Sequence, residues 1–393
     1  MSNVPKLRFK EFSGEWNKER FGELCGFEQG VQVDVELQTK EQSDDLVRFI
    51  RIENYTQNSS DFRFIPKELA KKKSIDEKEI AIVRYGATAG FIGRGFSGVL
   101  ANNLFKLKPN HKLLDDEYLY HYLKSYKAFH FFQSEMAGGA MPALSFGIVK
   151  ALKLPYPSKQ EQENIASFLT SVDTKIEQLT KKEQLLQQYK KGVMQKIFNQ
   201  EIRFKAYDGS EFCEWEEKSL NELVEFSNGK AHENDIDESG DYIVVNSKFI
   251  SSNGTVKKYS NSQIAPLYKN DIVMVMSDVP NGKALSKCYL IDENNKYTLN
   301  QRICSLRQTI NNNKFLIYLI NRNKYYLAFD SGVGQTNLRK DEVLNLKLKV
   351  PCLEEQNKIA NFLSSIDCKI EQTQKQLESS KEFKKALLQQ MFV

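Results

Sequence analysis

Residues 157–178 read PSKQEQENIASFLTSVDTKIEQ, and residues 351–372 read PCLEEQNKIANFLSSIDCKIEQ. The similarity continues without gaps, so that 157–198 aligns on 351–392 at a constant shift of 194 residues, with 18 of 42 positions identical. Repetition on this scale indicates one structural unit present in two copies.

A shorter repeat opens each half of the chain, where Arg8-Phe9-Lys10 recurs as Arg203-Phe204-Lys205. Each copy therefore has a globular part followed by a stretch of about 40 residues with a different character. We expect four segments: globular parts at 1–155 and 201–350, and helical segments at 156–200 and 351–393.

Both repeated stretches are predicted to be long helices. Pro155 and Pro157 end the preceding structure, and Ser158 and Glu161 have the spacing of a capping box. Apolar residues then recur with heptad spacing, which predicts that the helices pack on each other. The expected seam consists of Ile165, Leu169, Val172, Ile176, Leu179 and Leu186 in the first copy and Ile359, Leu363, Ile366, Ile370, Leu377 and Leu387 in the second.

The seam has one irregularity, because Thr373 and Ser380 replace Leu179 and Leu186 in the second copy. We expect the packing to be least continuous there. Two unrelated surface helices are the weaker interpretation, since the ends of the helices match residue by residue.

The globular parts combine β-rich runs, at 79–83 and 271–275, with amphipathic stretches at 118–132 and 315–327. This predicts an α+β fold class with two related globular α/β domains. The segments 30–137 and 229–331 nevertheless differ almost completely in sequence. Two scaffolds of one design with different surfaces suit two modules that read two different targets.

The composition is that of a globular protein, with 393 residues, of which 40% are hydrophobic. We expect a cytoplasmic protein, because no apolar run could span a membrane and the first residues lack the apolar core of a signal peptide. Six cysteines include no C-x-x-C pair and are interpreted as reduced thiols. Four scattered histidines, with His121 interpreted as a packed side chain, predict no metal site.

The net charge of +5 is uneven along the chain. Residues 1–79 carry −2 and 80–155 carry +5, whereas 201–241 carry −9 and 242–350 carry +9. Each globular part therefore begins acidic and ends basic. A basic half-domain is typical of phosphate binding, although solubility explains part of such a pattern.

Polar residues able to contact DNA lie among these basic residues in expected loops. Asn and Gln can bond adenine, and Arg and Lys can bond guanine. A single Asn in such a loop is also common turn chemistry, and a lysine triplet suits phosphate contact or a solvated face. The candidates are Lys71, Lys72, Lys73, Arg84, Tyr85, Thr88, Arg94, Asn102 and Asn103 in the first copy, and Lys248, Ser277, Asn281, Lys283, Asn300, Gln301, Arg302, Gln335, Thr336, Asn337 and Arg339 in the second.

No catalytic motif is found. Residues 281–284 contain Gly-Lys but lack the upstream glycine and the hydroxyl residue of a phosphate-binding loop. The triplets 173–175 and 367–369 have the acidic-x-Lys form of some nuclease sites. Because they occupy equivalent positions on the two helices, we interpret them as solvated charge and expect a chain that is not an enzyme.

Two variable globular domains, each followed by a helix with the pattern P-x-x-x-E-Q-x-x-I-A-x-F-L-x-x-[VI]-D-x-K-I-E, resemble the specificity subunit of type I restriction-modification enzymes. The resemblance covers essentially the whole chain. It implies that each globular part is a target recognition domain that reads one half of a bipartite, asymmetric DNA site. The two helices would form an antiparallel coiled coil that fixes the length of the unread spacer.

The same resemblance implies partners that carry the chemistry. Two modification subunits with the adenine methyltransferase site would dock on the helices, and restriction subunits with motor and nuclease activity would join them. S-adenosylmethionine, ATP and Mg²⁺ would then bind to those partners, and this chain would bind no cofactor. The alternative from another class is a coiled-coil adapter without sequence-specific DNA contact. The DNA sequence, the spacer length, the subunit stoichiometry and a role as a recombining cassette stay open.

Overall fold

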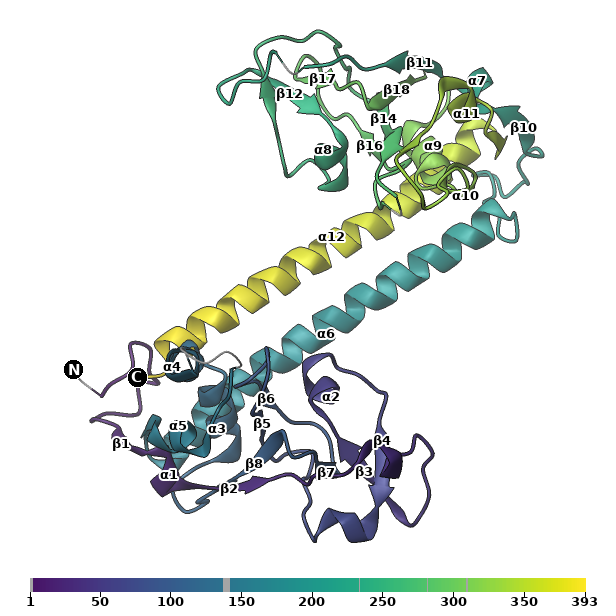
Figure 1. Cartoon of the computed structure of the whole chain (residues 1–393). Helices are drawn as coiled ribbons and strands as arrows, with labels where there is room; N and C mark the ends of the chain where they lie inside the picture. Colours follow the sequence, from purple (N-terminus) through teal and green to yellow (C-terminus); the bar gives the residue numbers. More distant parts are fainter. Residues whose placement is uncertain (1–2, 137–141, 233, 281, 309) are drawn as a thin grey trace. The chain divides into compact units, whose positions relative to one another are not determined.

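The computed structural model describes residues 3–393 with the exception of 137–141, 233, 281 and 309. The chain forms two compact units that interleave in sequence. Unit 1 consists of Met1–Lys182 and Thr373–Val393, and unit 2 consists of Glu183–Gln372. Each long helix therefore contributes one part to each unit (Figure 1).

Unit 1 contains three small sheets. The strands β1 (Asn17–Arg20) and β9 (Lys153–Tyr156) form an antiparallel pair. A four-stranded antiparallel sheet has the order β2-β8-β5-β6, with bounds Cys25–Gln29, Leu104–Pro109, Ala81–Val83 and Ile92–Gly93. A three-stranded sheet has the order β4-β3-β7, with bounds Arg63–Pro66, Leu46–Ile50 and Val99–Leu100, and β3 and β7 are parallel.

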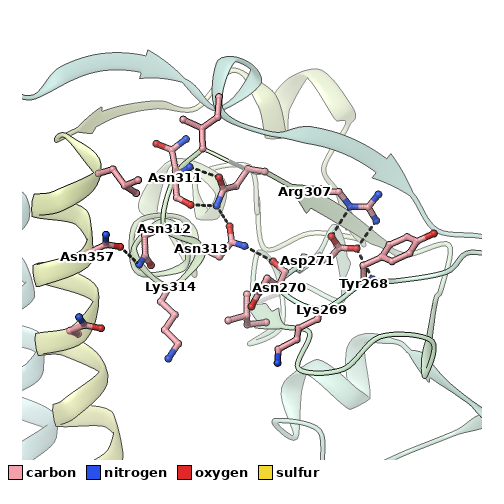
Figure 2. A pocket seen from close by; sticks show the side chains of 15 residues that line it. Tyr268, Lys269, Asn270, Asp271, Arg307, Asn311, Asn312, Asn313, Lys314 and Asn357 are labelled. Atoms are coloured by element: carbon pink, nitrogen blue, oxygen red, sulfur yellow. Dashed lines mark hydrogen bonds and ion pairs between the residues drawn. The ribbon is translucent and has the colours of Figure 1, made fainter.

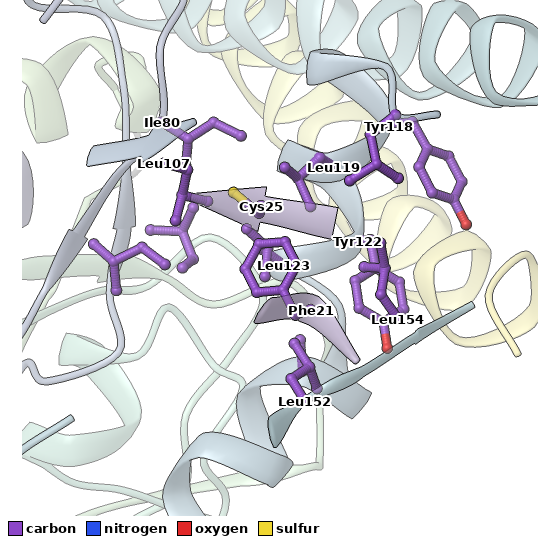
Figure 3. Close-up of a cluster of buried hydrophobic side chains, with 14 of the residues drawn as sticks. Phe21, Cys25, Ile80, Leu107, Tyr118, Leu119, Tyr122, Leu123, Leu152 and Leu154 are labelled. Carbon is purple, nitrogen blue, oxygen red and sulfur yellow. The ribbon is translucent and has the colours of Figure 1, made fainter. Parts of the chain in front are cut away.

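The helices of unit 1 are short apart from the shared ones. They are α1 (Phe21–Leu24), α2 (Ile52–Thr56), α3 (Asp116–Leu123), α4 (Tyr126–Met136) and α5 (Phe146–Ala151), with 3-10 turns at Val35–Leu37 and Lys67–Ala70. Figure 3 shows how Phe21 of α1, Leu107 of β8 and Leu119 of α3 meet in one buried cluster. Ile80 and Ile82 of the expected β-rich run belong to the same cluster, so this run and the amphipathic stretch pack into one core.

Unit 2 repeats this topology. The pair is β10-β20 (Glu216–Ser219, Lys347–Val350), the four-stranded sheet is β11-β18-β14-β16 (Glu225–Asn228, Ile303–Arg307, Ile272–Val275, Cys288–Leu290), and the three-stranded sheet is β13-β12-β17 (Tyr259–Ser260, Tyr242–Val245, Tyr297–Leu299). Unit 2 also has the two-stranded ribbon β15-β19 (Ser277–Asp278, Thr336–Asn337). Its helices are α7 (Leu220–Leu223), α8 (Ser247–Ser251), α9 (Asn313–Ile320), α10 (Lys324–Leu327) and α11 (Lys340–Leu344). Two domains with almost unrelated sequences therefore share one fold.

Each amphipathic stretch is divided into two helices, α3 with α4 and α9 with α10. The first helix of each pair begins at an equivalent cap, since Asp115 accepts a hydrogen bond from the Tyr118 N–H and Asn312 accepts one from the Phe315 N–H. In unit 2 the division follows from Arg322, whose φ of 55° leaves the helical region before Asn323 caps α10.

The long helices are α6 (Lys159–Phe198) and α12 (Leu353–Gln390). In unit 1 the first part of α6 packs with the last part of α12, so that Ile165 and Leu169 share a core with Leu387. In unit 2 the last part of α6 packs with the first part of α12, where Ile197 shares a core with Ile359. Within each unit the two helices run antiparallel, as predicted.

The predicted seam lies inside. Ile165, Leu169, Leu179, Ile359, Leu363, Ile366, Leu377 and Leu387 are buried, and Val172, Ile176, Leu186 and Ile370 are half-buried. Packing continues through the polar position Thr373, which is only 2% exposed. The aspartates of the two triplets are partly exposed, as expected for solvated charge, and each also forms an ion pair, Asp173 with Lys384 in unit 1 and Asp367 with Lys190 in unit 2.

No helix among the described residues combines the length and the apolar character needed to cross a lipid bilayer. The cysteines described by the structure are free thiols. Burial raises the pKa of Cys25 and of Cys304 to about 12. These two thiols stay protonated at neutral pH and act as small apolar core residues.

Candidate nucleic-acid interface

In unit 2 the turn that joins β17 to β18 meets the β15-β19 ribbon. The Met276 N–H donates to the carbonyl of Arg302 (3.0 Å), and the Leu338 N–H donates to the carbonyl of Met276 (2.8 Å). Ser277 pairs with Asn337 in the ribbon, and the Gln335 amide contacts the Ser277 hydroxyl. These backbone bonds bring together predicted contacts that are up to 60 residues apart in the sequence, namely Ser277, Arg302, Gln335, Thr336 and Asn337.

The start of α8 lies beside the same turn. The Asn300 N–H donates to the carbonyl of Val245 (3.2 Å), and Asn246 caps α8 by accepting from the Phe249 N–H (2.9 Å). Lys248 is exposed in α8, three residues after Val245. Lys230, which was not among the predicted DNA contacts, forms an isolated parallel β-bridge with Asn300 through the backbone.

The loop after β15 is shaped by one carboxylate. Asp278 accepts hydrogen bonds from the N–H groups of Val279 (2.9 Å), Ala284 (2.6 Å) and Leu285 (3.0 Å). The loop holds Lys283 exposed, whereas the candidate Asn281 lies outside the described residues. Arg339 is exposed at the start of α11, where its guanidinium pairs with Glu342.

In unit 1 the equivalent turn meets the loop after β5. The Arg84 N–H donates to the carbonyl of Asn103 (2.9 Å), and Tyr85 forms a bridge with Ala143. The Arg84 guanidinium stacks over the rings of Tyr85 and Phe146, 4.8 and 4.7 Å from their centroids. Stacking holds this guanidinium beside the exposed Tyr85, and the candidate Thr88, three residues later, is also exposed.

Gln29 links the same turn to the lysine triplet. Its side-chain amide donates to the backbone carbonyl of Asn102 (3.0 Å), and its backbone carbonyl accepts from the Lys73 ammonium (2.6 Å). Lys71 and Lys72 precede Lys73 in an exposed turn, with φ values of 52° and 59°. Arg94 lies apart from this group, because it pairs with Glu117 (2.6 Å) and covers the Tyr120 ring of α3 at 3.8 Å.

The two candidate interfaces share their backbone frame. The Ala101 N–H donates to Ile50 just as the Asn300 N–H donates to Val245, so Asn102 and Asn103 correspond to Gln301 and Arg302. Gly30 and Gly229 cross this turn at equivalent positions, and a Cβ at either glycine would collide with the carbonyl oxygens of the turn. One frame therefore presents different side chains in the two units.

A cationic cluster in unit 1 escaped the sequence analysis. Lys40, Arg51 and Arg63 surround the carboxylate of Asp61 at 3.0, 3.9 and 4.0 Å. The Lys40 ammonium is the main cause of the lowered pKa of Asp61. Arg51 follows Ile50, the partner of Ala101, so the cluster borders the same turn. Its members are far apart in a segment with a negative net charge, so no run of basic residues marks the cluster in the sequence.

A separate polar pocket of about 790 Å³ in unit 2 is lined by Tyr268–Asp271, by the residues that precede and begin α9, and by the first turns of α12 (Figure 2). Its polar walls are bonded to one another, since Arg307 pairs with Asp271, Asn312 donates to Asn357 and Asn313 donates to the carbonyl of Asn270. No predicted DNA contact lines it. Among the described residues no group of three His, Cys, Asp or Glu side chains could hold a metal ion.

The fold and the duplicated polar surface define a class of protein. The family described as the type I restriction modification DNA specificity domain matches the chain twice, over residues 13–188 and 213–379. The chain therefore belongs to this family and is a specificity subunit with two such domains. The family resemblance and the fold class predicted from the sequence are confirmed.

Particular relatives are similar to this chain over most of its length. The MjaVIII specificity subunit of Methanocaldococcus jannaschii is 28% identical over 97% of this chain and 94% of its own. The StySPI specificity subunit of Salmonella potsdam is 22% identical over 85% and 78%. The crystal structure of the S subunit of a type I restriction-modification system from M. genitalium has the same fold, with a TM-score of 0.65 at 18% identity over 99% of both chains.

Proposed function

We propose that the two units read the two different halves of one bipartite DNA site through the loops described above. The observation that carries this proposal is that one backbone frame presents Asn102 and Asn103 in unit 1 but Gln301 and Arg302 in unit 2. Identical frames suit the same groove geometry, and different side chains suit different bases.

The chain contributes recognition, and partner subunits contribute the chemistry. In this proposal the modification subunits bind S-adenosylmethionine and methylate adenine, and the restriction subunits use ATP and Mg²⁺. Incubation of the purified chain with DNA and S-adenosylmethionine should leave the DNA unmethylated. Methyl transfer by the isolated chain would contradict this division of labour.

Two copies of the modification subunit would dock on the helices. The aromatic residues Tyr189 and Phe383 occupy equivalent positions and are 55% and 52% exposed on the surface of their own unit. Large exposed aromatic rings are typical of interfaces. Their repetition at the shift of 194 residues supports two equivalent docking sites for one kind of partner.

The direct test is to sequence the methylome of a host that expresses this chain with its modification subunit. We expect methylated adenines in one bipartite, asymmetric sequence with a constant spacer. Exchange of 229–331 for the same region of another specificity subunit should change one half of that sequence. If the chain is only an adapter, the exchange will leave the methylated sequence unchanged, and DNA binding will lack the steep salt dependence of phosphate contacts.

A further inference from the structure

A polar cluster connects three helices in unit 2. Asp367 of α12 accepts hydrogen bonds from the Lys190 ammonium of α6 (2.5 Å) and from the Tyr318 hydroxyl of α9 (2.6 Å). Ser364, one helical turn before Asp367, lies 3.4 Å from the same hydroxyl. We call these four residues the Asp367 cluster.

Unit 1 contains its counterpart, the Asp173 cluster. Asp173 of α6 pairs with the Lys384 ammonium of α12, and His121 of α3 lies beside it with Nδ1 3.9 Å from the carboxylate. The other ring nitrogen, Nε2, is 3.1 Å from the Thr170 hydroxyl. The Asp, Lys and Thr/Ser positions all differ by 194 residues between the clusters, and His121 and Tyr318 are each the sixth residue of their helix.

The apolar seam alone leaves the register of the helices ambiguous. Because most of its residues recur every seven positions, a slip of seven residues would again place apolar side chains opposite apolar side chains along most of the seam, with Thr373 and Ser380 as the exceptions. A charged pair at one position removes that ambiguity, since a slip leaves a carboxylate opposite the wrong residue. The lysine side chains are only 24% and 15% exposed at Lys190 and Lys384, so a slip would also leave partly desolvated charges unpaired.

We infer that the Asp173 and Asp367 clusters fix the register of α6 against α12 and the seating of each recognition domain on the helices, and thereby determine which DNA spacer length is accepted. Their members are positioning residues that touch no DNA. A slip of one heptad moves a helix by about 10 Å, or about three base pairs, which is large against the spacing of half-sites. This inference rests on the proposed function, in which the helices set the spacer.

The test compares binding to duplexes that keep both half-sites and differ in spacer length by up to three base pairs. We expect Lys190→Gln and Asp367→Asn to reduce the preference for the native spacer at least about threefold, while penalties for base changes within the half-sites stay the same. The exposed neighbour Lys191→Gln is the matched control and should keep the native preference. The double variant Lys190→Asp with Asp367→Lys, which exchanges the two charges, should restore the spacer preference that the single variants lose.

Tyr318→Phe keeps the half-buried ring and removes only the hydroxyl that donates to Asp367. Lys384→Gln, with the control Lys385→Gln, repeats the test in unit 1. Unchanged spacer preference in all cluster variants, or an equal loss of affinity for every duplex, would overturn the inference and leave half-site recognition standing. A wild-type chain that shows no spacer preference would overturn the proposed function and the inference together.

Discussion

Individual polar residues have roles here that depend on what surrounds them. Asn312 and Asn246 cap helices, whereas Asn300 stands in the turn that joins β17 to β18 and bonds the carbonyl of Val245. Asn300 could be predicted from its residue type in a basic loop, but the hydrogen bond from the Met276 N–H to the Arg302 carbonyl could not, because backbone bonds between distant segments leave no pattern in the sequence. Arg94 was predicted as a DNA contact, but its guanidinium pairs with Glu117 and covers the Tyr120 ring within the domain.

Asn300→Ala or Gln301→Ala should relax the sequence requirement in one half-site only, by about 1–3 kcal/mol for the contacted base pair. Base-substituted duplexes in each half measure this discrimination. Lys248→Ala serves as the comparison, because loss of a phosphate contact weakens binding to all sequences and lowers the salt slope by about 1. Uniform weakening by Asn300→Ala would assign that residue to phosphate contact or to structure.

His121 should make the stability of unit 1 depend on pH. Burial lowers its pKa from 6.5 to about 4; Asp173 opposes this shift, and Lys384, Arg94 and Lys124 add to it. The folded state therefore keeps the imidazole neutral while the unfolded chain takes up a proton below pH 6.5. Stability should be complete above that pH and fall by about 3 kcal/mol as the pH drops toward 4.

Urea unfolding between pH 7.5 and 4.5 measures this effect as a shift of the transition midpoint. His121→Gln should flatten the pH dependence, whereas His111→Gln should keep it, because His111 is largely exposed. Equal pH profiles for wild type and His121→Gln would show that other groups control acid stability.

At the scale of elements, the long helices were predictable because a heptad pattern appears twice with matching ends. The sequence indicated that short strands are present but not which strands pair. For example, β3 pairs with β7, which lies about 50 residues later in the chain. The partners of Asp173 and Asp367 were missed for the same reason, since the paired lysines are 211 and 177 residues away along the chain. Periodicity identifies the helices, and only the fold identifies which charges they place together.

Insertion of one heptad after Leu179, with a matching heptad after Thr373, should lengthen the DNA spacer. Seven residues add about 10 Å of helix, or about three base pairs. Mapping of methylated adenines in the complex measures the spacer. As a control, residues 180–186 are replaced by the seven residues used for the insertion, which leaves the helix length unchanged and should keep the native spacer. An unchanged spacer after the insertion would show that the helices do not set the spacer length.

At the scale of the whole molecule, the duplication should determine stoichiometry. Because Tyr189 and Phe383 are equivalent and exposed, we expect native mass spectrometry to find two modification subunits per wild-type chain. Tyr189→Ala or Phe383→Ala should leave one subunit bound, and the double variant none. The exposed equivalents Gln188→Ala and Glu382→Ala are the controls, and two bound subunits in the double variant would place the docking sites elsewhere.

The interleaving of the two units has a consequence for biosynthesis. Phe392 packs against Tyr118 and Tyr122 in the core of unit 1, with ring centroids 5.6 and 5.5 Å apart. A ribosome translates all of unit 2 before it reaches this residue. The first recognition domain to emerge is therefore the last to close its core, and nascent chains released before that point expose the aromatic surface that chaperones and proteases recognise.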